Sequence, residues 1–228
     1  MKKKTYSILF LLIAVCMYFG TSCSDDNDNK VKVDEEWKAL NDKRFSDSIK
    51  VSDFLALDSQ SGEGKIYWKK SSIITNSDAD KTLRVTVAGN PEFTDTVEVR
   101  FEAWYYDKQN KKVVAASTEN PSYYSLMANP NKVPYKVCVN RRTTSTSSST
   151  EYYRFDRFTS SSSNYSVIDL RTDGWATLIQ DMKTGEEREA IVPYNLGYYA
   201  SVQAYIPAYT TLWYRIKLLK IIPMSGQE

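Results

Sequence analysis

The sequence of 228 residues contains no histidine. Catalysis by Ser-His-Asp or Cys-His pairs and metal sites with histidine ligands are therefore excluded. Cysteine is also scarce, with only Cys16, Cys23 and Cys138. If Cys16 is removed with a leader segment and Cys23 carries lipid, Cys138 has no partner for an intramolecular disulfide. A free cysteine of this kind usually behaves as a small buried hydrophobe.

The chain has no apolar run that could span a bilayer, which needs about 20 residues. Its longest apolar run, Ile8 to Phe19, has 12 residues and follows three lysines. The small residues Gly20-Thr21-Ser22 then stand directly before Cys23, an arrangement that resembles a bacterial lipobox. We therefore expect residues 1–22 to be a lipoprotein signal peptide and Cys23 to be lipidated. An ordinary secretory signal with a chance cysteine is the alternative.

An acidic run, Ser24-Asp25-Asp26-Asn27-Asp28, follows the candidate lipidation site. This run resembles the surface-export signal of Bacteroidota lipoproteins. The resemblance implies a lipid-anchored protein of the outer membrane that is exposed at the cell surface. Two alternatives stay open, namely the periplasmic face of that membrane and a solvated linker without an export role.

Neither sign of charge dominates the chain, whose formal net charge is +2. Removal of residues 1–22 would leave 206 residues. Three lysines leave with the leader, so 27 basic residues would face 28 acidic ones. A near-neutral chain gives nucleic-acid binding no electrostatic support. The length fits one domain with an N-terminal extension.

The hydrophobic pattern divides the remaining chain. Residues 23–33 are interpreted as a tether and residues 34–59 as a helical N-terminal extension. Asp34 is a good N-cap for a helix near 34–48, one face of which is apolar. Strands are predicted at 65–70, 83–88, 97–104 and 188–192, and from Leu212 onward.

The strand at 97–104 shows the clearest period of two. Its residues Val97, Val99, Phe101 and Ala103 alternate with a second set of mostly charged residues. This alternation predicts a strand that is buried on one face only.

A long segment, about 106–154, separates that strand from the next motif. Loops longer than about 15 residues are usually functional or disordered. Two short apolar stretches, 113–114 and 135–139, could pair as an added hairpin. We interpret the Ser/Thr run at 143–150 as a mobile flap rather than a binding motif.

A short helix is predicted from Gly174, with Asp173 as its cap. Its apolar residues stand at positions i, i+3, i+4 and i+7, which indicates one buried face. They are Trp175, Leu178, Ile179 and Met182. Together with the strands, this helix predicts an α+β fold in which an antiparallel sheet wraps around a short helix.

The last third of the chain carries a family resemblance. The pair Gly174-Trp175 opens the short helix, and a loop with Pro193, Leu196 and Tyr198 follows. The run Ile206-Pro207-Ala208-Tyr209-Thr210-Thr211-Leu212 then leads into the last strand. This order resembles FKBP-type peptidyl-prolyl cis-trans isomerases. The strand that begins at Val97 is similar to the Val-x-Val-x-Tyr-x-Gly strand of the same family.

The resemblance implies an FKBP-like domain over residues 60–222, interrupted by the insertion at about 106–154. It implies isomerisation of X-Pro bonds in envelope or secreted proteins, without cofactor or metal. Its partners would be proline-containing polypeptides. Within the pocket, Trp175 would form the floor, Asp156 would lie beside the substrate carbonyl, and Tyr198 would donate a hydrogen bond. The implied catalytic residues are Phe155, Asp156, Trp175 and Tyr198, and the implied substrate-binding residues are Phe101, Tyr165, Ile206 and Tyr214.

The sequence departs from the family pattern at several positions. A tyrosine is replaced by Phe101, a Val-Ile pair by Arg171-Thr172, a glycine by Tyr199 and a proline by Ala208. These changes leave two other hypotheses open. The same cleft could bind proline-containing segments without turnover. Alternatively, some of the 17 tyrosines could stack on sugars in a surface glycan-binding lipoprotein. Each pocket aromatic, taken alone, also fits an ordinary core position.

Overall fold

The computed structural model describes residues 33–51, 53–74, 89–119, 134–139, 142–144, 151–153, 170–203 and 206–224. Several expectations fall outside these residues, namely the lipidation site Cys23, the strand at 83–88, and the site residues Phe155, Asp156 and Tyr165.

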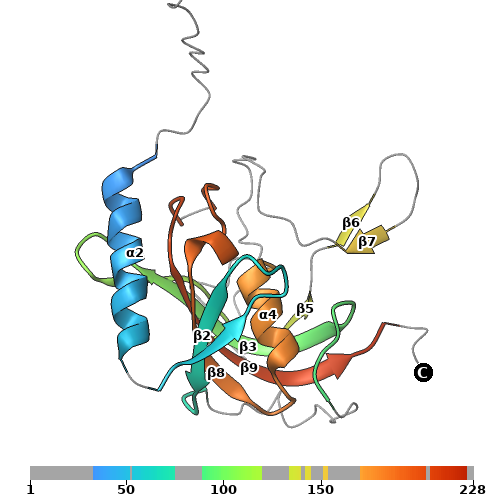
Figure 1. Ribbon diagram of the computed structural model, residues 1–228. Coiled ribbons are helices and arrows are strands. Elements are labelled where there is room, and N and C mark those ends of the chain that lie inside the picture. The colour runs from blue at the N-terminus through green and yellow to red at the C-terminus, as the bar shows by residue number, and fades with distance from the viewer. Residues whose placement is uncertain are drawn as a thin grey trace, which may run out of the picture. The chain divides into compact units, whose positions relative to one another are not determined.

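The described part of the chain is built on one antiparallel sheet (Figure 1). The strands follow the order β1-β2-β8-β9-β3-β4, and β5 also pairs with β3. Two further strands, β6 and β7, pair only with each other. The strands are β1 (Leu55–Asp58), β2 (Lys65–Lys70), β3 (Thr96–Tyr106), β4 (Lys112–Ser117), β5 (Tyr135–Cys138), β6 (Arg142–Thr144), β7 (Glu151–Tyr153), β8 (Glu187–Val192) and β9 (Leu212–Ile222).

Among the described residues, two α-helices accompany the sheet, α2 (Glu35–Lys50) and α4 (Asp173–Asp181). Figure 1 shows α2 standing beside the sheet, whereas α4 lies against its middle. A single 3-10 turn, η1 (Tyr194–Leu196), follows β8. This arrangement confirms the predicted α+β fold. No described helix is both long and apolar enough to cross a membrane.

Helix α2 forms where the sequence predicted a helix, because its ends are well stabilised. The Asp34 carboxylate accepts a hydrogen bond from the Trp37 N–H over 2.9 Å, as a helix N-cap does. Glu35 and Glu36 lie in the first turn and Lys50 in the last, which suits the helix dipole. The predicted helical extension at 34–59 was wrong at its end, since β1 follows α2 and pairs with β2.

Strand β3 pairs with β9 on one side and with β4 and β5 on the other, and its alternation is as predicted on the inner face. Val97, Val99, Phe101 and Ala103 all belong to the main core. The prediction that its other face meets solvent was wrong. On that outer face Arg100 is fully buried and Trp104 is 3% exposed.

The outer face is buried because it carries a second, smaller core. Cross-strand pairing places Trp104 opposite Trp213, and Trp213 opposite Ile191. The second half of α2 packs on this cluster through Phe45 and Ile49. The N-terminal helix therefore covers the part of the outer face that carries Trp104.

The segment after β3 does not form the added hairpin that the apolar stretches suggested. Strand β4 pairs with the C-terminal half of β3, and β5 pairs with its N-terminal half. Both strands therefore extend the main sheet. The Ser/Thr run predicted as a flap begins in β6, which pairs with β7 as a separate two-stranded sheet.

Candidate functional site

Helix α4 meets β8 at a point where only glycine fits. A Cβ atom built on Gly174 would lie 3.0 Å from Val192 Cγ2, and closer still to Val192 Cγ1. The same Cβ would lie 3.2 Å from the Leu196 carbonyl oxygen. The missing side chain lets the helix press directly on the strand. This contact sets the depth at which the next residue, Trp175, enters the core.

The N-cap of α4 is Thr172, so the predicted cap, Asp173, was one residue late. The Thr172 hydroxyl accepts a hydrogen bond from the Trp175 N–H over 3.2 Å. Thr172 is 1% exposed. The departure from the family pattern at this position therefore has a local purpose, because threonine satisfies a buried backbone N–H.

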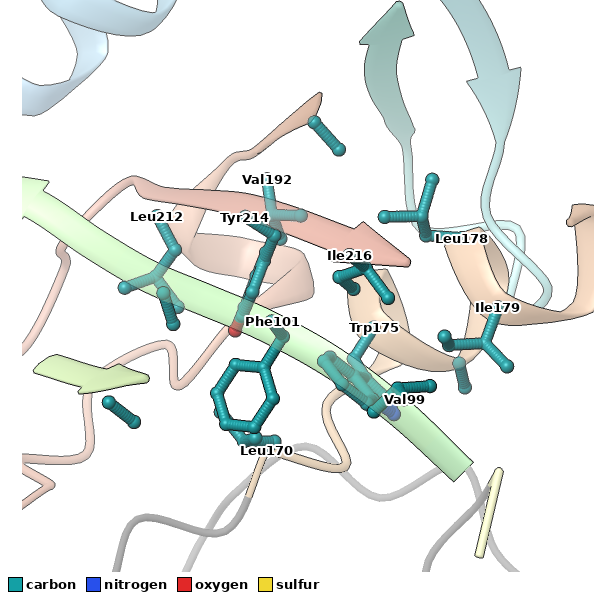
Figure 2. Close-up of a cluster of buried hydrophobic side chains, with 14 of the residues drawn as sticks. Val99, Phe101, Leu170, Trp175, Leu178, Ile179, Val192, Leu212, Tyr214 and Ile216 are labelled. Carbon is teal, nitrogen blue, oxygen red and sulfur yellow. The ribbon is translucent and has the colours of Figure 1, made fainter. Parts of the chain in front are cut away.

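Three aromatic rings meet at the centre of the inner face (Figure 2). The centroid of the Trp175 ring lies 5.8 Å from that of Phe101, with an interplanar angle of 83°. It lies 5.8 Å from the Tyr214 ring, at 68°. Edge-to-face packing of this kind is the favoured geometry for aromatic pairs. The Trp175 ring therefore comes from α4, and its two ring neighbours come from the adjacent strands β3 and β9.

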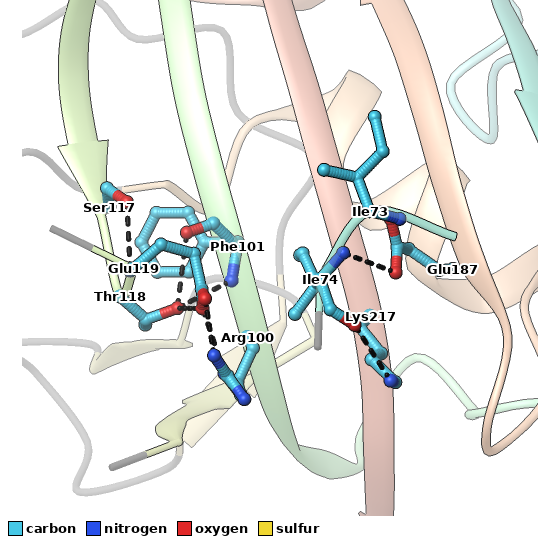
Figure 3. Close-up of polar contacts among 9 residues, drawn as sticks. All are labelled: Ile73, Ile74, Arg100, Phe101, Ser117, Thr118, Glu119, Glu187 and Lys217. Atoms are coloured by element: carbon cyan, nitrogen blue, oxygen red, sulfur yellow. Dashed lines mark hydrogen bonds and ion pairs between the residues drawn. The ribbon is translucent and has the colours of Figure 1, made fainter. Parts of the chain in front are cut away.

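Phe101 is held at both of its backbone polar groups by the residue that follows β4 (Figure 3). Its N–H donates to the Thr118 hydroxyl over 2.8 Å, and its carbonyl accepts from the Thr118 N–H over 2.9 Å. On the opposite face, the buried Arg100 guanidinium donates through Nε to the Glu119 carboxylate over 2.8 Å. Thr118 therefore fixes the backbone of Phe101, and Glu119 anchors the neighbouring Arg100 on the opposite face of the sheet.

The loop between β8 and β9 contributes two more of the predicted site residues. Tyr198 follows η1 and is 2% exposed, and Ile206 is 1% exposed. Ile206 forms an antiparallel bridge with Gln203, with N–O distances of 2.6 and 3.0 Å. Both Tyr198 and Ile206 pack in the same core cluster as Trp175.

The structure thus brings together five of the predicted site residues from four separate segments. None of the five exposes more than 2% of its surface. They are Phe101, Trp175, Tyr198, Ile206 and Tyr214.

The Trp175 indole N–H is buried, and it has no hydrogen-bond partner among the residues whose placement is described. A buried donor of this kind calls for an explanation in a native structure. The indole nitrogen of Trp175 points from α4 toward the side of the cluster where Val99 lies (Figure 2). The described part of the site is otherwise lined by apolar and aromatic side chains.

Sequence reasoning missed a second aromatic cluster on the same loop. Tyr194, Tyr199 and Tyr209 are half-buried, with ring centroids 5.4 to 6.2 Å apart. The rings are mutually tilted by 36° to 71°, so they pack on one another and do not form a flat platform for a sugar. The replacement of the family glycine by Tyr199 was the available signal.

Two of these tyrosines have backbone conformations that side chains rarely adopt. Tyr199 has φ of 51° and Tyr209 has φ of 58°. Residues other than glycine occupy this region at a cost, and the surrounding structure must hold them there. The Tyr209 N–H donates to the Tyr199 carbonyl over 2.7 Å, which ties the two strained residues together.

The comparison with known families agrees with the arrangement of these segments. Residues 87–219, more than half of the chain, match the profile described as FKBP-type peptidyl-prolyl cis-trans isomerase. That stretch contains all five of the clustered site residues. No curated protein matches the chain.

Solved structures of similar proteins include FkpA from Escherichia coli, with 14% identity and a TM-score of 0.48. That match covers 83% of this chain and 61% of the FkpA chain, so this chain spans less than two thirds of its length. A peptidyl-prolyl cis-trans isomerase from Pseudomonas syringae pv. tomato is 15% identical, with a TM-score of 0.46. That match covers 85% of this chain and 100% of the Pseudomonas chain.

Proposed function

This chain belongs to the FKBP-type peptidyl-prolyl cis-trans isomerase family, and we propose that it catalyses cis-trans isomerisation of X-Pro bonds. One observation carries the proposal beyond family membership. The three rings of Phe101, Trp175 and Tyr214 meet where the sequence resemblance places the proline pocket, and Tyr198 and Ile206 pack in the same cluster.

The reaction asks little chemistry of the protein. Rotation about a peptide bond is slow because about 18–20 kcal/mol is needed to break its resonance. At X-Pro bonds the two isomers are close in energy. A site accelerates the exchange if it binds the twisted amide better than either planar isomer. An apolar pocket does so by removing water from the carbonyl, because hydration favours the planar, charge-separated form.

The proposed roles follow from the positions of the residues. The Trp175 ring forms the floor under the proline ring, with Phe101, Tyr214 and Ile206 around it. Tyr198 donates a hydrogen bond to the substrate backbone. Outside the described residues, Asp156 lies beside the substrate carbonyl in this proposal, and Phe155 and Tyr165 complete the wall.

A second candidate function rests on the departures from the family pattern at the same site, at Phe101 and at Arg171-Thr172. Phe101 stands where the family has a tyrosine, so one hydroxyl is missing. In this alternative the domain binds proline-containing segments without turnover.

The Tyr198→Phe substitution separates these two functions. Removal of the hydroxyl should lower kcat/KM for an X-Pro peptide by about 10- to 100-fold if it stabilises the transition state. Exchange spectroscopy on a peptide that populates both isomers measures the rate directly. Asp156→Ala should reduce the rate as well. If the wild-type protein binds the peptide saturably but leaves its exchange rate unchanged, the protein is a peptide-binding module and not an isomerase.

We also propose that the protein works in the cell envelope, anchored through lipid on Cys23, with envelope or secreted proteins as clients. The support is the lipobox-like sequence and the acidic run that follows it. Two or more acyl chains provide firm membrane attachment. In this proposal residues 23–33 act as the tether between the anchor and the folded part.

Mass spectrometry of the mature N-terminus tests the anchor. The account expects a diacyl- or triacyl-modified Cys23, and it expects Cys23→Ser to move the protein from the membrane fraction to the soluble fraction. A mature N-terminus that is unmodified and begins at another residue would contradict the proposed lipid anchor. Protease treatment of intact cells distinguishes the outer surface from the periplasmic face.

A further inference from the structure

Helix α2 lies outside the segment that matches the isomerase family, yet it makes buried polar contacts with the site loop. The Trp37 indole N–H donates to the Thr210 hydroxyl over 3.1 Å. The Asn41 side-chain oxygen accepts from the Thr211 N–H over 2.9 Å. Asn41 is fully buried and Trp37 is 4% exposed.

These contacts form a connected set. The Asn41 amide donates to the Trp37 carbonyl over 2.9 Å, so both of its polar atoms are paired. The Thr210 hydroxyl in turn donates to the Pro207 carbonyl over 2.6 Å. A buried amide that lost its partners would be costly, so the set holds its members in one arrangement. We name Trp37, Asn41, Thr210 and Thr211 the helix clamp.

The helix clamp acts on the stretch that runs from Ile206 to Tyr214. Pro207, which it fixes through Thr210, directly follows Ile206. Thr211 directly precedes β9, the strand that carries Tyr214. The clamp therefore contacts the chain just after Ile206 and just before β9, on both sides of the turn that separates Ile206 from Tyr214.

The other arm of the same loop is also held by α2. The Lys38 ammonium lies 5.1 Å from the centroid of the Tyr194 ring. Hydrogen bonds to Asp42 and to Tyr194 raise the pKa of Lys38 above its ordinary value. Tyr194 packs on Tyr199 and Tyr209, the two residues with strained backbone. Strained conformations persist only where the surroundings impose them.

From these contacts we infer that Trp37 and Asn41 are positioning residues for the isomerase pocket. The N-terminal helix holds the loop between β8 and β9 in the conformation in which Ile206 and Tyr198 pack in the same core cluster as Trp175. This inference rests on the proposed function for its consequence in catalysis. The mechanical part, the control of the loop by α2, stands on its own.

The design of the helix supplies a matched control. The second half of α2 adheres to the outer face of the sheet through Phe45 and Ile49, away from the helix clamp. Ile49→Ala weakens the attachment of the helix without touching a clamp residue. Asn41→Leu removes the hydrogen bonds of the Asn41 side chain within the clamp at similar volume.

Amide hydrogen exchange tests the control of the loop without reference to activity. In Asn41→Leu, protection should fall at the Thr211 N–H and also at the Tyr209 N–H, which donates to Tyr199 and not to the helix. In Ile49→Ala both amides should keep their protection. Equal loss of protection at Tyr209 in the two variants, or no loss in either, would overturn the inference.

Isomerisation kinetics test the consequence for the site. Asn41→Leu should lower kcat/KM by about 10- to 100-fold, mainly through KM, as expected when a pocket wall moves by about 1 Å. Ile49→Ala should keep kcat/KM at a comparable fall in melting temperature. If kcat/KM falls in proportion to melting temperature in both variants, the clamp residues act only through stability, as any core residue does, and the inference fails.

Milder substitutions keep the test valid if Asn41→Leu does not fold. Trp37→Phe removes the indole N–H together with part of the ring, and it keeps an aromatic side chain beside Tyr105. Thr210→Val removes the hydroxyl, whereas Thr210→Ser retains it and should recover most of the lost kcat/KM. If the wild type itself leaves the X-Pro exchange rate unchanged, the proposed function fails, while the exchange protection at Tyr209 still decides whether α2 holds the loop.

Discussion

The two α-helices in the described part of the chain serve the site in opposite ways. Helix α4 has 9 residues, and Gly174 to Ile179 are all buried. It fits against the sheet by close packing. Helix α2 has 16 residues, of which only Trp37 and Asn41 are buried. Apart from its apolar contacts with the two cores, it reaches the loop through hydrogen bonds to named atoms.

This difference indicates a division of tasks. Packing of α4 sets the shape of the aromatic cluster, because interiors are dense and shape changes there are costly. Hydrogen bonding by α2 acts on the loop between β8 and β9, in addition to the hydrogen bonds that the loop makes within itself. Packing should therefore dominate stability, whereas the helix clamp should dominate the precision of the pocket.

The largest effect on stability should come from the floor of the cluster. Trp175→Ala removes a fully buried ring and should lower the free energy of unfolding by about 3–5 kcal/mol, as large core truncations do. Leu40→Ala, at a half-buried position on α2, should cost less than half as much. Urea denaturation followed by circular dichroism measures both. Equal losses would contradict the division between the helices.

The glycine at the start of α4 gives the next largest effect. Gly174→Ala places a methyl group against Val192 and should cost about 1–3 kcal/mol by overpacking. Val192→Ala in the same chain makes room for that methyl group. The double variant should therefore lose less stability than the sum of the two single changes. Strict additivity would show that the close contact is not the reason for glycine.

Much of the architecture could be predicted because period and caps are local signals. The alternation of apolar and charged residues predicted the inner face of β3, and Asp34 predicted the start of α2. The buried face of α4 was evident from Trp175, Leu178 and Ile179. These signals depend only on neighbours in the sequence.

The parts that could not be predicted depend on long-range contacts. Nothing near Arg100 or Trp104 in the sequence indicates that α2 and its neighbours cover the outer face of β3. The bonds from Trp37 to Thr210 and from Asn41 to Thr211 join residues more than 160 positions apart. Their partners become visible only when both segments are folded. The grouping of Phe101, Trp175 and Tyr214 was foreseeable only through the family resemblance.

A smaller effect should come from the charges on the outer face. Glu189 lies between Arg215, at 2.8 Å, and Lys69, at 3.7 Å. Glu189→Gln should lower the free energy of unfolding by about 1 kcal/mol, because the pairs are only partly exposed. The loss should shrink in 1 M salt, which screens such pairs. The exposed pair of Lys43 and Asp47 is the control, and Lys43→Gln should change stability less.

The smallest effect should come from the cap of α2, and it should depend on pH. The hydrogen bond from the Trp37 N–H, assisted by Lys108, holds the pKa of the Asp34 carboxyl below its ordinary value of 3.8. A lowered pKa in the folded state means that the ionised carboxylate stabilises the fold above pH 3.8. This contribution is lost as the pH falls through the folded-state pKa. Asp34→Ala should therefore lower the melting temperature at pH 7 and differ less from wild type near pH 3. A constant difference would exclude the charge of the cap as its cause.

The central claim is that the aromatic cluster is a working prolyl isomerase site. Its most direct test is the rate of cis-trans exchange in an X-Pro peptide, measured by exchange spectroscopy with residues 34–228, with and without an FKBP-class macrolide. The account predicts acceleration that depends on proline and is abolished by the macrolide. An exchange rate equal to that of the peptide alone would contradict it, and the buried cluster of Phe101, Trp175 and Tyr214 would then be core without catalysis.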